Sequence, residues 1–276
     1  MSDCHTGYID GGNSMEYRDI LFEISDNVAT IKLNRPEVGN AWSKDTPTEV
    51  MDAISCCADN DEVRAIVITG SGKHFCAGGD INRFKRLIDT KQYLEIPSIL
   101  RAGEMGKAIR RCLKPVIAMI NGAAAGAGCS IAMACDFRVM TPSSKLVMAF
   151  INVGLSGDTG GLYYLQKLVG TAIAGDLMMR GRPVTGEQAE KYGLVNVLAE
   201  EGKLEESTYA FANKMANAPT FALARQKDLI NRFFYTDLDA YTELEAKYMQ
   251  ECSETKDFEE AVNSFLEKRT PVFQGK

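Results

Sequence analysis

Two segments of this 276-residue chain repeat one order: a buried-looking strand, a turn rich in glycine and alanine, and a helix start. The first joins A-I-V-I-T-G at 65–70 to H-F-C-A-G-G-D at 74–80. The second joins K-P-V-I-A-M-I at 114–120 to N-G-A-A-A-G-A-G-C at 121–129. A turn without bulky side chains lets a ligand approach backbone N–H groups, which lack partners at a helix N-terminus. Two such turns brought together can donate to one oxygen and form an oxyanion hole.

The composition, with 45% hydrophobic and 25% charged residues, is that of an ordinary globular protein. A net charge of −6 and a pI near 5.2 argue against a nucleic-acid surface. The sequence has no apolar run long enough to cross a bilayer, and residues 1–16 lack the apolar stretch of a secretory signal. We therefore expect a flexible segment at 1–16, a cytoplasmic location, and neither nucleic acid nor membrane as a partner.

The chain has eight cysteines and two histidines, and no two cysteines have C-x-x-C spacing. This pattern argues against a zinc site, so no metal is expected. Reduced thiols are the expectation for a chain without an export signal. Cys76 and Cys129 fall in the two turns, where we interpret them as small apolar filling rather than as nucleophiles.

Hydrophobic periodicity predicts strands that return after intervening helices, which is an α/β arrangement. A hairpin is expected at 21–25 and 28–33, inner strands at 65–69, 116–120 and 137–140, and helices at 46–58, 84–92 and 99–113. From residue 204 the strand signal ends, and a lid or an assembly module is expected. Four amphipathic helices are predicted there, at 201–217, 221–234, 238–251 and 257–268.

Neither glycine-rich turn fits a nucleotide-binding motif. The T-G-S-G-K-H run at 69–74 has its glycines too close for a phosphate loop, and His74 stands where Ser or Thr would hold magnesium. The second turn spaces its glycines as G-x-x-x-G-x-G at 122–128, not as the dinucleotide G-x-G-x-x-G. Nucleotide hydrolysis and NAD chemistry are therefore excluded.

The motifs together resemble the crotonase, or enoyl-CoA hydratase/isomerase, superfamily. They are F-C-A-G-G-D at 75–80, K-P-V-I-A-M-I-N-G at 114–122, G-A-G at 126–128, C-D at 135–136, V-G-L-S-G-D-T-G-G at 153–161, the G-R-P-V-T-G run at 181–186 and F-L-E-K-R at 265–269. The resemblance implies an acyl-CoA substrate with no further cofactor. It also implies a ββα spiral core at 17–203 and a helical region at 204–276 that packs subunits into trimers or hexamers.

The same resemblance places the two oxyanion donors on the backbone N–H groups of Gly79 and Ala127. The alternative is that both turns are only tight helix starts that pack on strands. Two turns with matched flanks favour the functional interpretation. Asp80 is expected to cap the helix after the first turn, and Asp136 to fix a helix-to-strand corner.

Hydratases of the superfamily use two glutamates, and the corresponding positions here are Ser130 and Phe150. The remaining candidate is Asp158, which stands where several isomerase branches carry their base. The segments around Asp158 and at the C-terminus look closest to the phenylacetate-pathway branch, which isomerises a ring-epoxide acyl-CoA. The alternative for Asp158 is an N-cap of a helix at 159–169, and both roles can coexist. An apolar pocket of Phe150, Leu155 and Leu162 would raise its pKa.

The resemblance assigns the loop at 34–40 to the CoA side, although Glu37 stands where many members carry a basic residue. Lys268 is expected to reach a CoA phosphate, with an exposed helix-end lysine as the alternative. The expected substrate contacts are Val38, Ala77, Gly78, Phe150, Tyr163 and Lys268.

The sequence thus predicts an acyl-CoA isomerase in which Asp158 moves a proton while the thioester oxygen accepts from Gly79 and Ala127. A hydratase or hydrolase that uses Asp158 alone, or an aspartate nucleophile, is the alternative within the class. A different class remains open: an oligomeric scaffold that binds acyl-CoA without turnover.

Overall fold

The computed structural model describes residues 7–9, 13–15 and 17–276. Its main element is a six-stranded sheet in the order β11-β8-β6-β5-β4-β3. β3 and β4 pair antiparallel, and every other pair in this sheet is parallel. The strands are β3 (Ile20–Ser25), β4 (Val28–Leu33), β5 (Ala65–Gly70), β6 (Val116–Ile120), β8 (Phe137–Met140) and β11 (Val197–Leu198).

The hairpin and the three inner strands lie where the sequence predicted them. Asp26 and Asn27 join β3 to β4, and both have positive φ angles, of 50° and 63°. Two consecutive residues of this kind form the tight turn that matches the twist of antiparallel strands. The inner strands β5 and β6 are buried throughout, as expected for parallel strands covered on both faces.

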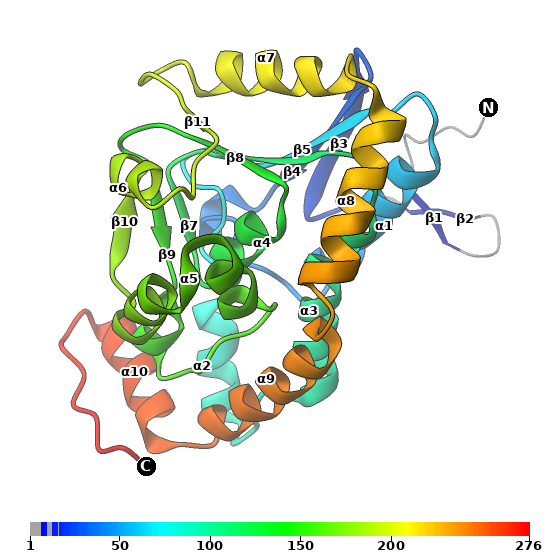
Figure 1. Ribbon diagram of the computed structural model, residues 1–276. Helices are drawn as coiled ribbons and strands as arrows, with labels where there is room; N and C mark the ends of the chain where they lie inside the picture. Colours follow the sequence, from blue (N-terminus) through cyan, green and yellow to red (C-terminus); the bar gives the residue numbers. More distant parts are fainter. Residues whose placement is uncertain (1–6, 10–12, 16) are drawn as a thin grey trace.

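The two faces of the main sheet are covered by different helices (Figure 1). Val67, Ile117 and Val139 face α7 (Leu204–Ala216) and pack against its Ala212 and Ala216. The opposite face carries the large core, to which α1, α3 and α4 contribute. The helices of the body are α1 (Thr46–Asp59), α2 (Ile81–Asp89), α3 (Ile96–Arg111), α4 (Ala127–Ala134), α5 (Gly161–Arg180) and α6 (Gly186–Lys191).

A second, three-stranded sheet in the order β10-β9-β7 was not predicted. Its strands have three residues each, and β7 is made of three alanines, so neither length nor periodicity marks them. This sheet positions the second glycine turn. Its strands are β7 (Ala123–Ala125), β9 (Lys145–Val147) and β10 (Pro183–Thr185), and short 3₁₀ turns are η1 (Pro36–Val38) and η2 (Ala149–Val153).

The four predicted C-terminal helices are present, and they wrap the body from the top of Figure 1 to its base. The buried Lys227 anchors α8 by donating to Asp136 at 2.7 Å. Asp136 also accepts from Arg110 at 2.7 Å and from the Val116 amide at 2.9 Å, so its predicted role at the corner is confirmed. The helices are α7 (Leu204–Ala216), α8 (Thr220–Phe234), α9 (Leu238–Ser253) and α10 (Lys256–Glu267).

The predicted division of the chain at 1–16, 17–203 and 204–276 stays a prediction. Residues 1–6, 10–12 and 16 lie outside the described residues, while β1 (Gly7–Ile9) and β2 (Asn13–Met15) pair antiparallel. The boundary at 204 coincides with the first residue of α7. Among the described residues, no helix combines the length and the apolar character that crossing a membrane would take.

Candidate active site

The two glycine-rich turns meet through backbone hydrogen bonds. The Cys76 amide donates to the Ala123 carbonyl at 3.2 Å, and the Ala125 amide donates to the Cys76 carbonyl at 2.8 Å. Between these two bonds the first turn forms an isolated parallel bridge with β7. The turns follow neighbouring parallel strands, β5 and β6, so their carboxyl ends reach the same edge of the sheet. The sequence predicted two turns, and the sheet brings them together.

Gly79 and Ala127 both line the cavity between the turns. Ala127 is the first residue of α4, and its helix-start amide has no intrahelical acceptor. In the described part of the chain, no hydrogen bond joins the amide of Gly79 or of Ala127 to an acceptor. Gly126 precedes Ala127 at φ 51° and ψ −126°, a conformation that L-residues rarely adopt. The geometry therefore leaves two donors free beside one cavity.

Gly78 has a different role from the predicted substrate contact. Its φ is +91°, and a Cβ at this position would lie 2.7 Å from the Ala125 carbonyl oxygen. Its amide donates to the Cys76 sulfur at 3.3 Å, and its carbonyl accepts from the Trp42 amide at 2.9 Å. Both backbone groups are engaged within the protein, and Gly78 does not line the cavity described below. It lets the two turns approach closely.

The cysteines in the turns are buried, as predicted. Burial raises the pKa of the Cys76 and Cys129 thiols to about 12. A thiol with such a pKa stays protonated near neutral pH and is a poor nucleophile. Their interpretation as small filling beneath the turns is therefore the one that the geometry supports.

The loop at 34–40 is tied to the first turn by Asn40. Its side-chain amide donates to the Ser71 carbonyl at 2.9 Å and to the His74 carbonyl at 2.6 Å, and its side-chain oxygen accepts from the Arg35 amide at 2.9 Å. The amide of Ala77 donates to the Gly39 carbonyl at 2.9 Å. These bonds place the predicted CoA loop beside Gly79. Asp80 caps α2 by accepting from the Asn82 amide at 2.9 Å, as predicted.

Asp158 lies on a backbone that is left-handed on either side of it. Gly157, Thr159 and Gly160 have φ angles of 128°, 63° and 72°. Positive φ at the β-branched Thr159 is uncommon and is typical of functional sites held by their surroundings. These residues delay the start of α5 to Gly161, with Gly160 as the cap. The Asp158 side chain accepts from the Thr159 hydroxyl at 2.9 Å and makes no capping bond, so the N-cap alternative is wrong.

Burial raises the pKa of the Asp158 carboxyl from its ordinary value near 3.8 to about 6. The Thr159 hydroxyl and the positive charge of Arg83 oppose this rise by stabilising the carboxylate. A base with a pKa near 6 is ionised at neutral pH and still strong enough to accept a proton from carbon. A perturbed pKa in a cavity is also a mark of functional groups.

Glu245, which no sequence pattern singled out, holds the Asp158 loop from α9. Its side chain is 7% exposed, and its Oε2 accepts from the Gly160 amide at 2.8 Å across 85 residues of sequence. Within the described residues, Oε1 is buried and has no hydrogen-bond partner. Burial raises the pKa of Glu245 to about 8, and the negative charge of Asp158 adds to the rise. Burial therefore favours the protonated form of Glu245, whose side chain braces the strained backbone.

Replacing Glu245 by methionine is expected to lower turnover by roughly 10–10², because misplacing a reacting group by about 1 Å has an effect of that order. KM should change little, since Glu245 does not line the cavity. Glu245→Gln is the matched control, because its amide oxygen can still accept from Gly160 and it carries no charge. Equal losses in both variants, or a loss in neither, would contradict this role; steady-state kinetics at pH 7 distinguishes the cases.

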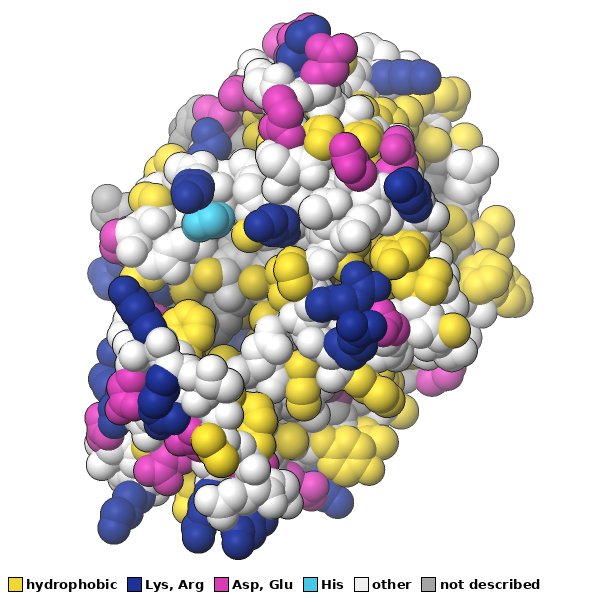
Figure 2. All heavy atoms as spheres, turned by 90° about the vertical axis from the view of Figure 1, so that its left-hand side faces the viewer, with side chains coloured by type: hydrophobic (Ala, Val, Ile, Leu, Met, Phe, Trp, Pro, Cys, Tyr) yellow, Lys and Arg dark blue, Asp and Glu magenta, His cyan; other side chains and the backbone are white. Residues whose placement is uncertain are grey.

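The cavity consists of two chambers that share one wall. The wide chamber has about 1290 Å³ of space between atoms and the cationic chamber about 570 Å³, each including the solvent at its open mouth. Figure 2 shows a hollowed face with apolar side chains in the hollow and Lys and Arg side chains around it. The wide chamber includes Val38, Ala77, Phe150, Leu155 and Phe265, and the cationic chamber includes Lys44, Arg83, Leu94, Ser98 and Arg101. Both include Gly79, Phe84, Ala127, Asp158 and Met249.

The structure thus brings together most of the predicted site residues. Gly79, Ala127 and Asp158 lie on the shared wall, and Val38, Ala77 and Phe150 line the wide chamber. Ser130, the other hydratase position, is buried and donates to the Gly126 and Asp158 carbonyls, both at 3.3 Å. Asp158 is therefore the carboxyl that both chambers share.

Tyr163 and Lys268 lie outside both chambers. Tyr163 packs in an aromatic cluster with Tyr164, Tyr235 and Tyr241 at centroid distances of 5.3–6.1 Å, so it belongs to the core rather than to the acyl pocket. Lys268 caps α10 with a φ of 55° and is exposed. Among the described residues, no three His, Cys, Asp or Glu side chains gather as a metal site would need.

Comparison with known proteins identifies the class. A family model described as enoyl-CoA hydratase/isomerase matches residues 23–276. The chain is 33% identical to a trans-2-decenoyl-[acyl-carrier-protein] isomerase of Streptococcus mutans, over 95% of this chain and 100% of that protein. It is 32% identical to a 1,2-epoxyphenylacetyl-CoA isomerase of Escherichia coli, over 93% and 98%.

A crystal structure of an enoyl-CoA hydratase from Mycobacterium avium subsp. paratuberculosis superimposes with a TM-score of 0.85, at 27% identity, over 94% of this chain and 100% of that one. The architecture is therefore the crotonase fold, with a helical C-terminal region. Because both sequence and fold match over nearly the whole chain, the chain belongs to the enoyl-CoA hydratase/isomerase family.

Proposed function

We propose that the protein is an acyl-CoA isomerase that shifts a double bond or rearranges a ring next to a CoA thioester. The observation that carries the proposal is the shared wall, where a single carboxyl, Asp158, stands with the free amides of Gly79 and Ala127. One carboxyl suffices to remove a proton and return it elsewhere. Addition of water in the hydratases uses two glutamates, whose positions here are held by Ser130 and Phe150.

In this proposal the thioester oxygen accepts from Gly79 and Ala127, and the two donors stabilise the enolate that forms when a proton leaves. Asp158 takes the proton from the α or γ carbon and delivers it to a second carbon. The pantetheine arm lies in the wide chamber against Val38, Ala77 and Phe150. Lys268, which is exposed at the end of α10, meets a CoA phosphate. No metal or redox group takes part in these steps, and a cytoplasmic location is proposed with the function.

The proposal is tested by incubating the purified protein with saturated, 2-enoyl, 3-enoyl and cyclic acyl-CoAs and following them by mass spectrometry. Isomerisation leaves the mass unchanged but alters the absorption spectrum and incorporates deuterium from D₂O. A gain of one water would assign a hydratase, which is the second candidate because the superimposed crystal structure is that of an enoyl-CoA hydratase. Release of free CoA would assign a hydrolase. Tight binding with no turnover of any substrate would assign a non-catalytic scaffold.

The pH profile of kcat/KM is expected to rise about tenfold per pH unit below pH 6 and to level off above it. Only the ionised Asp158 accepts a proton, and its pKa is raised to about 6, so the rate falls as pH drops through that value. An unperturbed aspartate would keep its activity down to about pH 4. A profile that stays flat between pH 5 and 7 would therefore contradict Asp158 as the base.

We further propose that the C-terminal helices pack subunits together into a trimer, or into a hexamer made of two trimers. α8 presents a row of exposed apolar side chains that one subunit leaves uncovered, and Phe233 is 74% exposed. Sedimentation is expected to show a trimer or a hexamer, and Phe233→Glu should weaken it. A fully active monomer at micromolar concentration would refute the assembly. The exposed side chains are Phe221, Leu229, Ile230, Phe233 and Phe234.

A further inference from the structure

The cationic chamber carries more positive than negative side chains, and the proposed reaction involves them only through the stabilising effect of Arg83 on the Asp158 carboxylate. Lys44, Arg83 and Arg101 line it, and Asp158 is the one carboxyl that the described part of the chain contributes to it. Within the described residues, none of these three cations forms an ion pair with a carboxylate. The chain as a whole has a net charge of −6, so this local excess runs against the overall balance.

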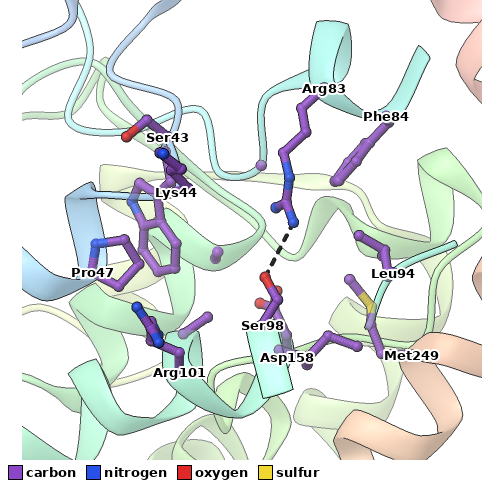
Figure 3. Close-up of a pocket in the computed structure, with 15 residues that line it drawn as sticks. Ser43, Lys44, Pro47, Arg83, Phe84, Leu94, Ser98, Arg101, Asp158 and Met249 are labelled. Atoms are coloured by element: carbon purple, nitrogen blue, oxygen red, sulfur yellow. Dashed lines mark hydrogen bonds between the residues drawn. The ribbon is translucent and has the colours of Figure 1, made fainter. Parts of the chain in front are cut away.

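Arg83 is the most enclosed of the three cations. It is half-buried on α2, whereas Lys44 and Arg101 are exposed at the rim. Figure 3 shows its guanidinium pointing across the chamber to Ser98, whose hydroxyl accepts at 3.1 Å. The buried Arg138, by contrast, donates to four acceptors in the body, at 2.6–3.5 Å. A guanidinium has five N–H donors, so most of those on Arg83 remain available inside a cavity.

Apart from Ser43 and Ser98, the rest of the chamber wall is largely apolar. Trp42, Leu94 and Ile99 line it, together with Phe84 and Met249 of the shared wall. An acyl group that starts at the oxyanion donors would therefore find both apolar side chains and a guanidinium in this chamber. A planar guanidinium recognises a carboxylate by paired, charge-assisted hydrogen bonds.

We infer that this chamber takes an acyl group that ends in a carboxylate, with Arg83 as the group that binds the distal anion. The inference rests on the proposed function for the position of the thioester. Under that proposal CoA occupies the wide chamber, which is the larger of the two and is lined by Glu37 and Val38 of the predicted CoA loop. The cationic chamber then receives the acyl tail. Arg83 selects CoA thioesters of dicarboxylic acids, whose far end is a free carboxylate, over acyl groups that end in a methyl group.

Binding of unreactive ligands tests the inference without requiring turnover. Calorimetry would compare saturated acyl-CoAs of four to six carbons that end in a methyl group or in a carboxylate, for example hexanoyl-CoA and adipoyl-CoA. At the best-fitting length, the carboxylate ligand is expected to bind at least about 10-fold tighter than its methyl counterpart, as a charge-assisted pair allows. This preference should fall steeply as salt is raised, because the pair is only half-buried.

Arg83→Met should remove the preference, so that the ratio of the two dissociation constants falls by about 10-fold or more. Arg86→Met is the matched control, because Arg86 lies on the same helix, is exposed and does not line the chamber, and it should leave the ratio unchanged. CoA alone is measured with both variants. If Arg83→Met weakens CoA and both acyl-CoAs equally, Arg83 binds CoA itself and the inference is wrong.

A wild-type preference for the methyl ligand at every length would likewise overturn the inference. The proposed function fails by a different result, the absence of isomerisation in the substrate screen. The two failures are distinguishable, since the binding ratio does not depend on turnover and isomerisation of a methyl-ended enoyl-CoA does not depend on Arg83 selecting an anion.

Discussion

Replacing Asp158 by asparagine is expected to lower turnover by about 10³ or more, within the range that general acid–base groups contribute. An amide does not accept a proton at neutral pH, so deuterium uptake from D₂O at the acyl α or γ carbon should disappear with turnover. The local geometry should persist, because the asparagine oxygen can still accept from the Thr159 hydroxyl. Proton–deuterium exchange followed by mass spectrometry measures the effect directly.

The same substitution is expected to stabilise the protein at pH 7. Folding raises the pKa of Asp158 from about 3.8 to about 6, so the folded state binds more protons than the unfolded state between these values. Stability therefore falls as pH rises from 4 to 6, by up to about 3 kcal/mol, and Asp158→Asn avoids that loss. At pH 4 the two proteins should unfold alike. Near wild-type turnover in the variant would overturn the proposed mechanism and leave the family assignment unchanged.

Ala127→Pro should reduce turnover by roughly 10²–10³, the effect of losing one oxyanion-hole donor. Proline removes the amide hydrogen at a position where the helix tolerates it, because Ala127 is the first residue of α4. Its ring also occupies space close to the first turn, since a Cβ on Gly78 would lie 3.2 Å from the Ala127 nitrogen. The loss should appear in kcat, because the donor acts most strongly on the enolate.

Ala127→Gly is the matched control, because it changes the side chain and keeps the N–H. Circular dichroism melting of both variants establishes that each is folded before rates are compared. Unchanged turnover in a folded Ala127→Pro protein would remove this amide from the oxyanion hole. A comparable loss in Ala127→Gly would show that the methyl group, rather than the donor, matters at this position.

The local patterns of the sequence predicted the elements that a short stretch of chain determines by itself. The hairpin depends on Asp26 and Asn27, and the inner strands on continuous apolar runs at 65–69 and 116–120. The Asp80 cap depends on the carboxyl at a helix start. In each case the responsible residues lie within a few positions of one another. The resemblance then assigned Gly79, Ala127 and Asp158, which the structure brings to one wall.

Patterns of this kind do not describe backbone conformations that depend on distant partners. Asp158 could equally have capped a helix, but left-handed Thr159 and Gly160 move the helix start to Gly161. Tyr163 looked suited to an acyl pocket, yet Tyr235, which follows α8, and Tyr241 on α9 pack against it. The three-residue strands of the second sheet carry no periodicity of their own.

The sequence by itself therefore determined the crotonase-type order of strands and turns, the two glycine-rich turns that carry the donor amides, and Asp158 as the candidate base. Only the tertiary structure decided what surrounds them: Glu245 arriving from α9, Met249 closing the shared wall and Arg83 facing the second chamber. The physical reason is how far apart in sequence the interacting residues lie. Turns, caps and strand periodicity follow from interactions between near neighbours, whereas the charge, burial and strain of the site come from helices that are distant in sequence and meet only when the chain is folded.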